Sequence, residues 1–268
     1  MKKTILLLIA LASVAAALAQ GQPAAEIQQK QWSVLWQQHA AEYRALCYQT
    51  FNNAKWRLTE KLKTRKTNEK WAIVTDLDET ILNNSYVYGK VIKQNKNYTA
   101  ADWKAWADLG AATAVPGAVE FLNWASSKGI SIFYVSNRDT GIIKPTLANL
   151  QQLKLPNADA SHMLFMSNTS SKEPRRKQVA ANYKVVMLMG DNLNDFTDGF
   201  ARKGVKDRLL ATDAELEAWG DKFIVLPNPV YGDWENSLYD FNRKLSPEQR
   251  TALRNELLQN TSPLEKQP

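Results

Sequence analysis

The sequence has little cysteine or histidine and lacks several common catalytic motifs. Its single cysteine, Cys47, allows no disulfide within the chain, so the fold must depend on its core. The two histidines, His39 and His162, belong neither to a His-Glu-x-x-His nor to an Arg-His-Gly string, which disfavours zinc hydrolases and histidine phosphatases. A Walker-type loop and a Gly-x-Ser-x-Gly elbow are also missing, so neither of those catalytic sites is expected.

Long apolar runs are scarce as well. The apolar stretch at residues 5–17 follows two lysines, is too short for a membrane span, and leads into Ala17-Leu18-Ala19, a small-x-small cleavage site. Residues 1–19 are therefore predicted to be a signal peptide, and the protein is expected to be exported, periplasmic or secreted. No cysteine stands at Gln20 or Gly21, so lipid anchoring is not expected.

The sequence has only a modest excess of positive charge. Removing residues 1–19 leaves 32 basic and 27 acidic residues, a net charge of +5 that suits an anionic substrate. The basic residues are spread along the chain, apart from a denser run at 61–70 that we interpret as a solvated linker. A nucleic-acid-binding protein usually has a stronger basic stripe with interleaved aromatics, so no nucleic-acid polymer is expected as a partner.

Apolar runs typical of buried parallel strands alternate with helical stretches along most of the chain. This alternation predicts an α/β fold, a parallel sheet with helices on both faces. The expected strands are 71–76, 130–136, 162–166, 185–190 and 223–226. The expected helices are 25–62, 118–127, 144–153, 173–182, one from 195 onward, 214–219 and 246–258.

The same pattern divides the chain into segments. Residues 20–70 are expected to be an N-terminal helical segment with a linker, 71–245 the core, and 246–268 a C-terminal helix and tail. Residues 83–114 interrupt the alternation after the first strand with polar and aromatic residues, and we expect them to form a lid over the strand ends. The N-terminal helix, this insertion and the C-terminal segment would together make a smaller, mainly helical cap.

The strand at 71–76 ends in a pair of acids, Asp76 and Asp78. Residues two apart in an extended chain point the same way, and open α/β sheets bind ligands at the carboxyl ends of their strands. Two acids there repel each other unless a cation or a shared proton relieves them. The motif therefore predicts a site for a hard cation such as Mg²⁺, with one aspartate free to attack, although a solvated acidic turn would fit it equally well.

Two further segments could bind phosphate. Residues 133–138 (Phe-Tyr-Val-Ser-Asn-Arg) end another strand, where Ser136 and the following backbone N–H groups can bind phosphoryl oxygens and Arg138 can add a charged fork. Lys172, just before a proline suited to a first helical turn, could reach a phosphate or hold Asp76 ionised. Arg175 and Arg176 are alternatives for that role.

A fourth acidic motif follows the very apolar strand at 185–190. Asp191 can complete an all-oxygen metal site, and Asp195, four residues on, faces the same way and can support it from behind. Capping of a helix start would be the structural role of Asp191.

Together these motifs resemble the haloacid dehalogenase (HAD) superfamily, subfamily IIIB, and in particular class C acid phosphatases, the family of the bacterial outer-membrane lipoprotein 5′-nucleotidase. The resemblance covers about residues 30–245 and implies a HAD-like Rossmannoid fold. It also implies a Mg²⁺-dependent acid phosphatase that hydrolyses phosphomonoesters, including nucleoside 5′-monophosphates, through an aspartyl-phosphate. The strings that carry it are residues 76–80 (Asp-Leu-Asp-Glu-Thr), 115–118 (Val-Pro-Gly-Ala), 133–138, 190–196 (Gly-Asp-Asn-Leu-Asn-Asp-Phe) and 229–234 (Pro-Val-Tyr-Gly-Asp-Trp).

The resemblance assigns a role to each motif residue. Asp76 would be the nucleophile, and Asp78 would protonate the leaving alkoxide and then activate water. A Mg²⁺ ion would be held by Asp76, by the backbone carbonyl of Asp78 and by Asp191, with Asp195 behind them. The phosphoryl group would be held by Ser136, Asn137 and Lys172.

Aromatic residues near the lid are implied to stack flat substrates. By position these are Tyr98, Trp103 and Tyr231, whereas we expect Trp106 and Trp234 to pack in the core. Two other functions use the same scaffold: a phosphotransferase that passes the phosphoryl group to an alcohol, and a non-catalytic binding or storage protein. The expected partner is a small phosphomonoester, and a homodimer is compatible with the sequence.

Overall fold

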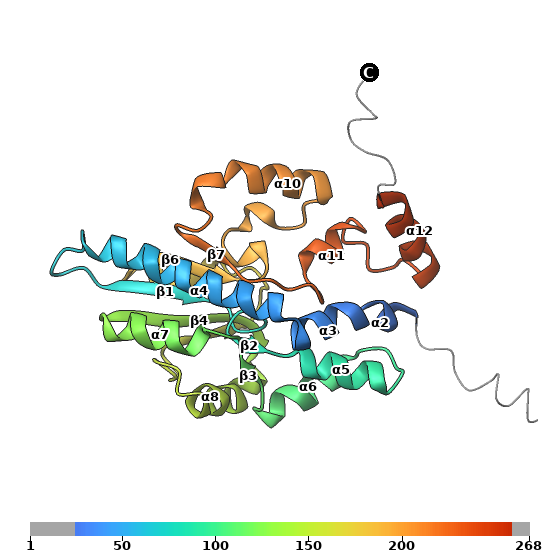
Figure 1. The fold of residues 1–268 in the computed structure, drawn as a ribbon, viewed down its shortest axis with the longest axis horizontal. Helices are drawn as coiled ribbons and strands as arrows, with labels where there is room; N and C mark the ends of the chain where they lie inside the picture. The colour runs from blue at the N-terminus through green and yellow to red at the C-terminus, as the bar shows by residue number, and fades with distance from the viewer. Residues whose placement is uncertain (1–24, 259–268) are drawn as a thin grey trace, which may run out of the picture.

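The computed structural model describes residues 25–258, which form an α/β fold around a five-stranded parallel sheet (Figure 1). The strand order is β5-β4-β1-β6-β7, and every neighbouring pair is parallel. The strands are β1 (Trp71–Thr75), β4 (Ile130–Asp139), β5 (Met163–Met166), β6 (Lys184–Gly190) and β7 (Phe223–Val225). Each expected strand is present within a few residues, and the predicted fold class is confirmed.

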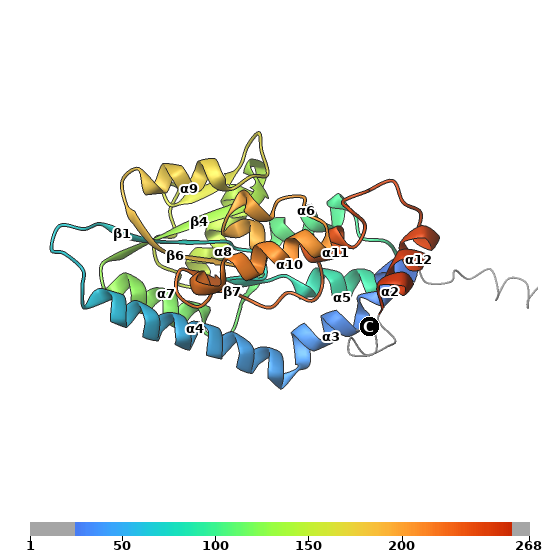
Figure 2. The same ribbon diagram turned by 90° about the horizontal axis from the view of Figure 1, so that it is seen from above.

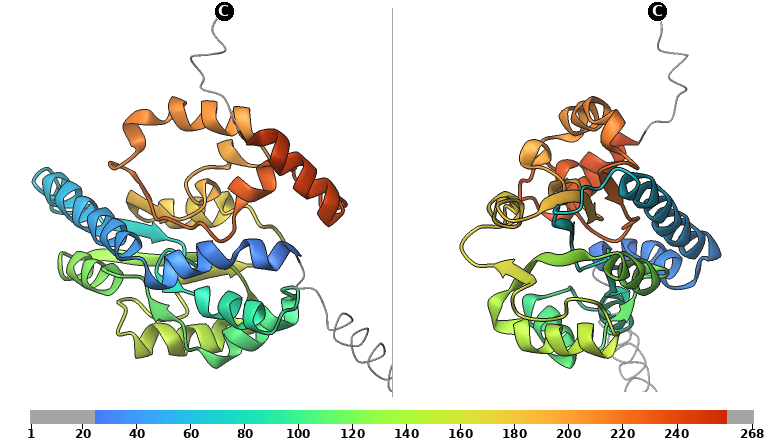
Figure 3. Two further views of the ribbon diagram at one scale, coloured as in Figure 1. Left: turned by 45° about the vertical axis from the view of Figure 1, so that its right-hand side comes forward. Right: turned by 90° about the vertical axis from the view of Figure 1, so that its left-hand side faces the viewer.

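Both faces of the sheet are covered because side chains alternate along each buried strand. On β1, Trp71 and Ile73 belong to a core shared with α4 (Ala41–Leu62) and α7 (Ala118–Ser127). Ala72 and Val74 belong to a second core, which includes Val179 of α9 (Glu173–Ala180). Figure 2 and the right panel of Figure 3 show α9 on one side of the sheet and α4 with α7 on the other.

Two helical predictions are wrong in detail. The expected helix 25–62 is three helices, α2 (Ala25–Gln29), α3 (Gln31–His39) and α4. A turn at Lys30 separates α2 from α3, and extended backbone at Ala40 separates α3 from α4. The expected helices from 195 onward and at 214–219 are replaced by short 3₁₀ turns. The α-helix of this region, α10, lies between these turns. Side chains of Asn192 and Thr197 bond to nearby backbone N–H groups and favour turns there. These elements are η2 (Leu193–Asp195), η3 (Asp198–Phe200), α10 (Val205–Ala214) and η4 (Leu216–Ala218).

The insertion after β1 leaves and rejoins the core through a two-stranded antiparallel sheet. Its strands β2 (Leu82–Asn83) and β3 (Thr113–Ala114) flank two helices, α5 (Ser85–Lys93) and α6 (Ala100–Leu109). Helix α3 packs against α5. These helices, together with α11 (Asp233–Ser237) and α12 (Pro247–Leu257), gather at one end of the sheet (Figures 1 and 3).

The remaining expected elements also have counterparts. Helix α8 (Ile143–Gln152) follows the prediction closely, and Ser246 starts α12 with a reciprocal capping box to Gln249. None of the helices within residues 25–258 is long and apolar enough to cross a membrane. The predicted signal peptide at 1–19 and the tail beyond residue 258 lie outside the described residues.

The topology places the strand-end motifs together. From the central strand β1 the chain moves outward to β4 and β5, then crosses back to β6 on the other side of β1. In open α/β sheets the crevice at such a reversal, beyond the carboxyl ends of the strands, is where ligands bind. The motifs after β1, β4 and β6 all border this crevice.

Candidate active site

A cavity of about 440 Å³ lies at the carboxyl ends of β1, β4 and β6. Its volume falls in the range of small-molecule sites. The acids from two different strand ends, the lysine before α9 and aromatic rings from the lid and from the loop after β7 all line it. The chain therefore brings motifs that are more than one hundred residues apart into one site.

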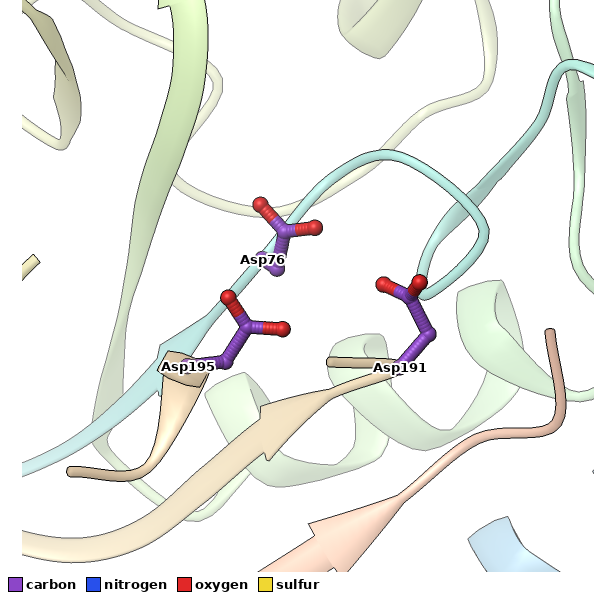
Figure 4. Close-up of side chains that lie close together, drawn as sticks. All are labelled: Asp76, Asp191 and Asp195. Atoms are coloured by element: carbon purple, nitrogen blue, oxygen red, sulfur yellow. The ribbon is translucent and has the colours of Figure 1, made fainter. Parts of the chain in front are cut away.

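Three carboxylates converge at the base of this cavity (Figure 4). Asp76 follows β1, and Asp191 and Asp195 follow β6; one oxygen of each lies within 4.8 Å of the others. The Nζ of Lys172 lies 2.5 Å from Asp76 Oδ1 and 2.6 Å from Asp195 Oδ1. Each of these side chains was predicted from its motif, and the fold brings them together at one place.

The charges in this cluster are not balanced. Burial raises the pKa of Asp76 to about 7; Lys172 opposes the rise, and repulsion from Asp195 and Asp78 adds to it. Burial, then repulsion from Asp195 and Asp76, also raises the pKa of Asp191 well above its ordinary value. Burial alone would lower the pKa of Lys172, but Asp195 and Asp76 outweigh it and raise that pKa. One lysine therefore does not neutralise the three acids.

The cluster fits a divalent cation. Its ligand atoms are carboxylate oxygens, the hard donors that suit Mg²⁺. Thr80 Oγ1 and Asn228 Nδ2 donate to the two oxygens of Asp191 at 3.0 and 2.8 Å and fix its orientation. A further positive charge here would relieve the repulsion that raises the pKa of Asp76 and Asp191.

Both side-chain oxygens of Asp195 are bound by other groups of the protein. Its Oδ2 accepts the backbone N–H of Asn192 at 3.0 Å, and its Oδ1 pairs with Lys172. The close approach of the Asp195 side chain to the backbone of residue 190 requires glycine there, since a Cβ on Gly190 would lie 2.3 Å from Asp195 Oδ2. These contacts suit the supporting place behind the metal ligands that the sequence suggested, and that place stays a prediction.

Mg²⁺ is expected to stabilise the protein more at neutral than at acidic pH. The pKa of Asp76 is raised to about 7 from 3.8, so the fold favours its protonated form. The stability contributed by this group is complete below about pH 4 and is lost as the pH rises through about 7. Mg²⁺ requires the ionised form, so its effect should grow over the same window. Saturating Mg²⁺ should raise Tm by about 5 °C or more at about pH 7.5, and by less at about pH 5.

Thermal melts of metal-free protein with and without Mg²⁺ at the two pH values would measure this difference. Asp191→Ala should lose the Mg²⁺-dependent rise, whereas Asp213→Asn, a change at an exposed position of α10, should keep it. A larger Mg²⁺ effect at the acidic pH would contradict the assignment.

Asp78 lies beside this cluster and is held by a partner that the sequence did not identify. Arg138 donates to it from Nε at 3.0 Å and from Nη2 at 2.8 Å, and Asn84 Nδ2 donates at 2.8 Å. The guanidinium of Arg138 also lies 5.2 Å from the centre of the Trp103 ring. Arg138, expected to bind phosphate directly, therefore orients the second aspartate.

The structure separates the three basic candidates near α9. Arg175 donates to the backbone carbonyl of Ser136 and to Asn137 Oδ1. Arg176 donates to the carbonyls of Asn194 and Asp195. Of the three, Lys172 alone lines the cavity.

The two other predicted phosphate ligands differ in position. Asn137 lines the cavity, and its Nδ2 donates to the carbonyl of Ser170 at 2.9 Å. Ser136 is buried behind the cavity wall, where its Oγ accepts the backbone N–H of Arg138 at 3.2 Å. Phosphate binding by these two residues stays a prediction.

An aromatic wall faces the acids. Tyr98, Trp103 and Tyr231 all line the cavity, and Tyr88 lies between Tyr98 and Tyr231 with ring centroids 5.0 and 5.4 Å away. We call Tyr88, Tyr98, Trp103 and Tyr231 the aromatic wall. Aromatic rings beside a cavity of this kind suit a flat ligand.

The two tryptophans expected in the core have different environments. Trp106 is half-buried, stacks on Tyr86 and donates from Nε1 to Asn84 Oδ1 at 2.8 Å. The core prediction for Trp234 is wrong, because this residue lies in the first turn of α11 at the surface and is 44% exposed. Its Nε1 donates to the carbonyl of Tyr231 at 3.2 Å, so it supports the aromatic wall from outside.

Several residues that support the site acids were not predicted from the sequence. Thr80 belongs to the first acidic motif, so its proximity to Asp78 could have suggested a role. Asn84 and Asn228 bond to the site acids only because the lid and the loop after β7 fold back over the strand ends. No spacing along the chain indicates those contacts.

The fold and the site define the class of the protein as a phosphatase of the haloacid dehalogenase superfamily. The family model described as HAD superfamily, subfamily IIIB (Acid phosphatase) matches residues 4–234, and the chain belongs to that family. The resemblance inferred from the motifs is thereby confirmed, and the protein is a phosphomonoesterase.

Two solved structures support the same conclusion. The class C acid phosphatase from Bacillus anthracis is similar to this chain at 40% sequence identity with a TM-score of 0.83, and the match covers 88% of this chain and 99% of that one. A crystal structure of the Bacillus anthracis class C acid phosphatase with tungstate bound is similar at 40% identity, with a TM-score of 0.84 and the same coverage.

Proposed function

We propose that this acid phosphatase is Mg²⁺-dependent, acts on nucleoside 5′-monophosphates among other phosphomonoesters, and uses Asp76 as its nucleophile. The observation that supports the proposal best is the excess of carboxylates around Lys172 at the foot of the aromatic wall. Such a cluster suits a cation and an anionic group, and the rings above it suit a flat base. The residues that would hold Mg²⁺ are Asp76, Asp191 and the backbone carbonyl of Asp78.

Phosphoryl transfer depends mainly on positioning and on charge neutralisation. When bound, Mg²⁺ would supply positive charge beside the phosphoryl oxygens. Lys172 neutralises part of the charge on Asp76 and can do the same for the phosphoryl group.

The two aspartates then divide the chemistry. A carboxylate oxygen of Asp76 forms a bond to phosphorus as the bond to the leaving oxygen breaks, and Asp78 donates a proton to that oxygen. In the second step Asp78 takes a proton from water, the water oxygen attacks phosphorus, and the bond from Asp76 to phosphorus breaks. Inorganic phosphate leaves and both aspartates return to their starting states.

Metal removal tests the first part of the proposal. EDTA should abolish release of phosphate from p-nitrophenyl phosphate, and Mg²⁺ should restore it. A preference for Zn²⁺ is not expected, because the ligand atoms are all oxygens. Asp191→Ala should raise the Mg²⁺ requirement or abolish activity. Full activity in metal-free buffer would remove the metal from this proposal. Added alcohol with product analysis would show whether transfer competes with hydrolysis.

Loss of the aromatic wall should affect nucleotides selectively. A base stacked on a ring gains about 1–3 kcal/mol, so Trp103→Ala or Tyr231→Ala should raise KM for nucleoside monophosphates about tenfold or more. KM for small aliphatic phosphates should change little, because Lys172 and the acids are untouched. A panel of kcat and KM values over nucleoside monophosphates, sugar phosphates and p-nitrophenyl phosphate would measure this.

Two controls sharpen this test. Trp56→Ala removes a tryptophan that is 65% exposed on α4 and does not line the cavity, and it should leave every constant unchanged. Trp103→Phe keeps a ring beneath Arg138 and so separates base stacking from any effect on Asp78. Parallel losses on all substrates would mean that these rings serve the fold alone.

A further inference from the structure

Glu79 is a buried acid next to the site with no part in the chemistry described above. It follows Asp78 directly, is 1% exposed and does not itself line the cavity. Its φ is 57°, in the left-handed region that favours glycine. A strained backbone at a buried acid points to contacts of its side chain that a glycine could not make.

The carboxylate of Glu79 accepts hydrogen bonds from three different segments of the chain. Its Oε1 accepts the backbone N–H of Asn84 at 2.8 Å and the Nε2 of Gln37 at 3.4 Å. Its Oε2 accepts the hydroxyl of Tyr231. One side chain thus joins the start of the lid, helix α3 and the loop after β7.

Two of these partners lead directly into the cavity. Asn84 is fully buried, and its Nδ2 donates to Asp78 Oδ1 at 2.8 Å. Tyr231 lines the cavity with its ring stacked on Tyr88. The carboxylate of Glu79 is therefore linked to Asp78 through Asn84, and it bonds directly to Tyr231 of the aromatic wall.

We propose that Glu79 is a positioning residue that fixes Asp78 and Tyr231 relative to each other. It would hold the Tyr231 ring where a base stacks, and through Asn84 it would hold the carboxyl group that serves the leaving oxygen. The inference rests on the proposed function, since it assigns Tyr231 to the base of a nucleotide. Substrate preference and proton transfer would then depend on a residue that touches neither substrate nor metal.

A comparison of Glu79→Ala, Tyr231→Phe and the double variant tests the arm through Tyr231. Each single change removes the same hydrogen bond and keeps the ring, so each should raise KM for a nucleoside monophosphate about tenfold, as expected for one lost buried hydrogen bond. The double variant should be no worse than Glu79→Ala alone. Glu79→Gln, whose amide can bond both partners, should recover most of the loss.

The arm through Asn84 has a separate readout. Glu79→Ala should lower kcat for an alkyl phosphate more than for p-nitrophenyl phosphate, because a good leaving group needs less help from Asp78. Tyr231→Phe should leave that ratio unchanged. Glu217→Ala at an exposed position and Tyr183→Phe at a half-buried one are matched controls that should change neither KM nor the ratio.

Glu79→Gly keeps the inference testable if the alanine variant does not fold. Glycine removes the side chain and accepts the left-handed backbone without strain, so this variant should melt at a higher temperature than Glu79→Ala and show both defects. Additive losses in the double variant, or equal losses on all substrates by a folded variant, would overturn the positioning role. Wild-type enzyme that does not hydrolyse nucleoside monophosphates would instead refute the proposed function, and the leaving-group ratio would still test Glu79.

Discussion

Replacement of Asp76 by asparagine is expected to reduce kcat by on the order of 10⁴-fold or more. The neutral amide has no charged oxygen to attack phosphorus, so the first covalent step cannot take place. Asp195 is not free to take over, because Lys172 engages its Oδ1 and the backbone N–H of Asn192 engages its Oδ2. The measurement is steady-state hydrolysis of p-nitrophenyl phosphate by purified variant in saturating Mg²⁺.

The fold should survive this change. Removing one of three crowded carboxylates relieves repulsion, and Lys172 keeps its partner Asp195. The Tm of metal-free Asp76→Asn at neutral pH should therefore equal or exceed that of the wild type. Asp213→Asn, with full activity, is the matched control. A folded Asp76→Asn protein with substantial turnover would refute the nucleophile assignment.

Asp78→Asn should also lose activity, by an amount that depends on the leaving group. A positioned general acid or base contributes about 10²–10⁴-fold, so hydrolysis of an alkyl phosphate should fall by that order. p-Nitrophenol leaves readily without a proton, so its ester should lose much less wherever the first step limits the rate.

The ratio of the two losses is an internal control for folding and metal binding, which affect both substrates alike. Arg138 and Asn84 should keep the asparagine in place, since both bond to the side chain that it replaces. Equal loss on both esters would argue against an acid role for Asp78 and would favour a purely structural one.

The parallel sheet and the acidic cluster could be predicted because each depends on local patterns. The apolar runs of β1 and β6 are buried on both faces, and polar residues follow at their carboxyl ends. A parallel sheet brings such ends to one edge, so Asp76 and Asp191 meet whatever the loops between them do.

The parts that could not be predicted depend on contacts across the fold. Arg138 bonds to Asp78 because the end of β4 lies beside the loop after β1, which no periodicity reveals. Trp234 was expected in the core from its residue type alone, yet it lies in the first turn of a short helix at the surface. The turns at 193–200 form because polar side chains compete locally with helical hydrogen bonds.

The small antiparallel sheet at the base of the lid has a consequence for how this enzyme can diversify. Leu82 pairs with Ala114 and Asn83 with Thr113, so the insertion departs and returns at neighbouring points. Changes of length between those points need not move β1 or the aspartates that follow it. A change in the helices of this insertion can therefore alter which substrates enter the cavity while Asp76 keeps its place at the end of β1.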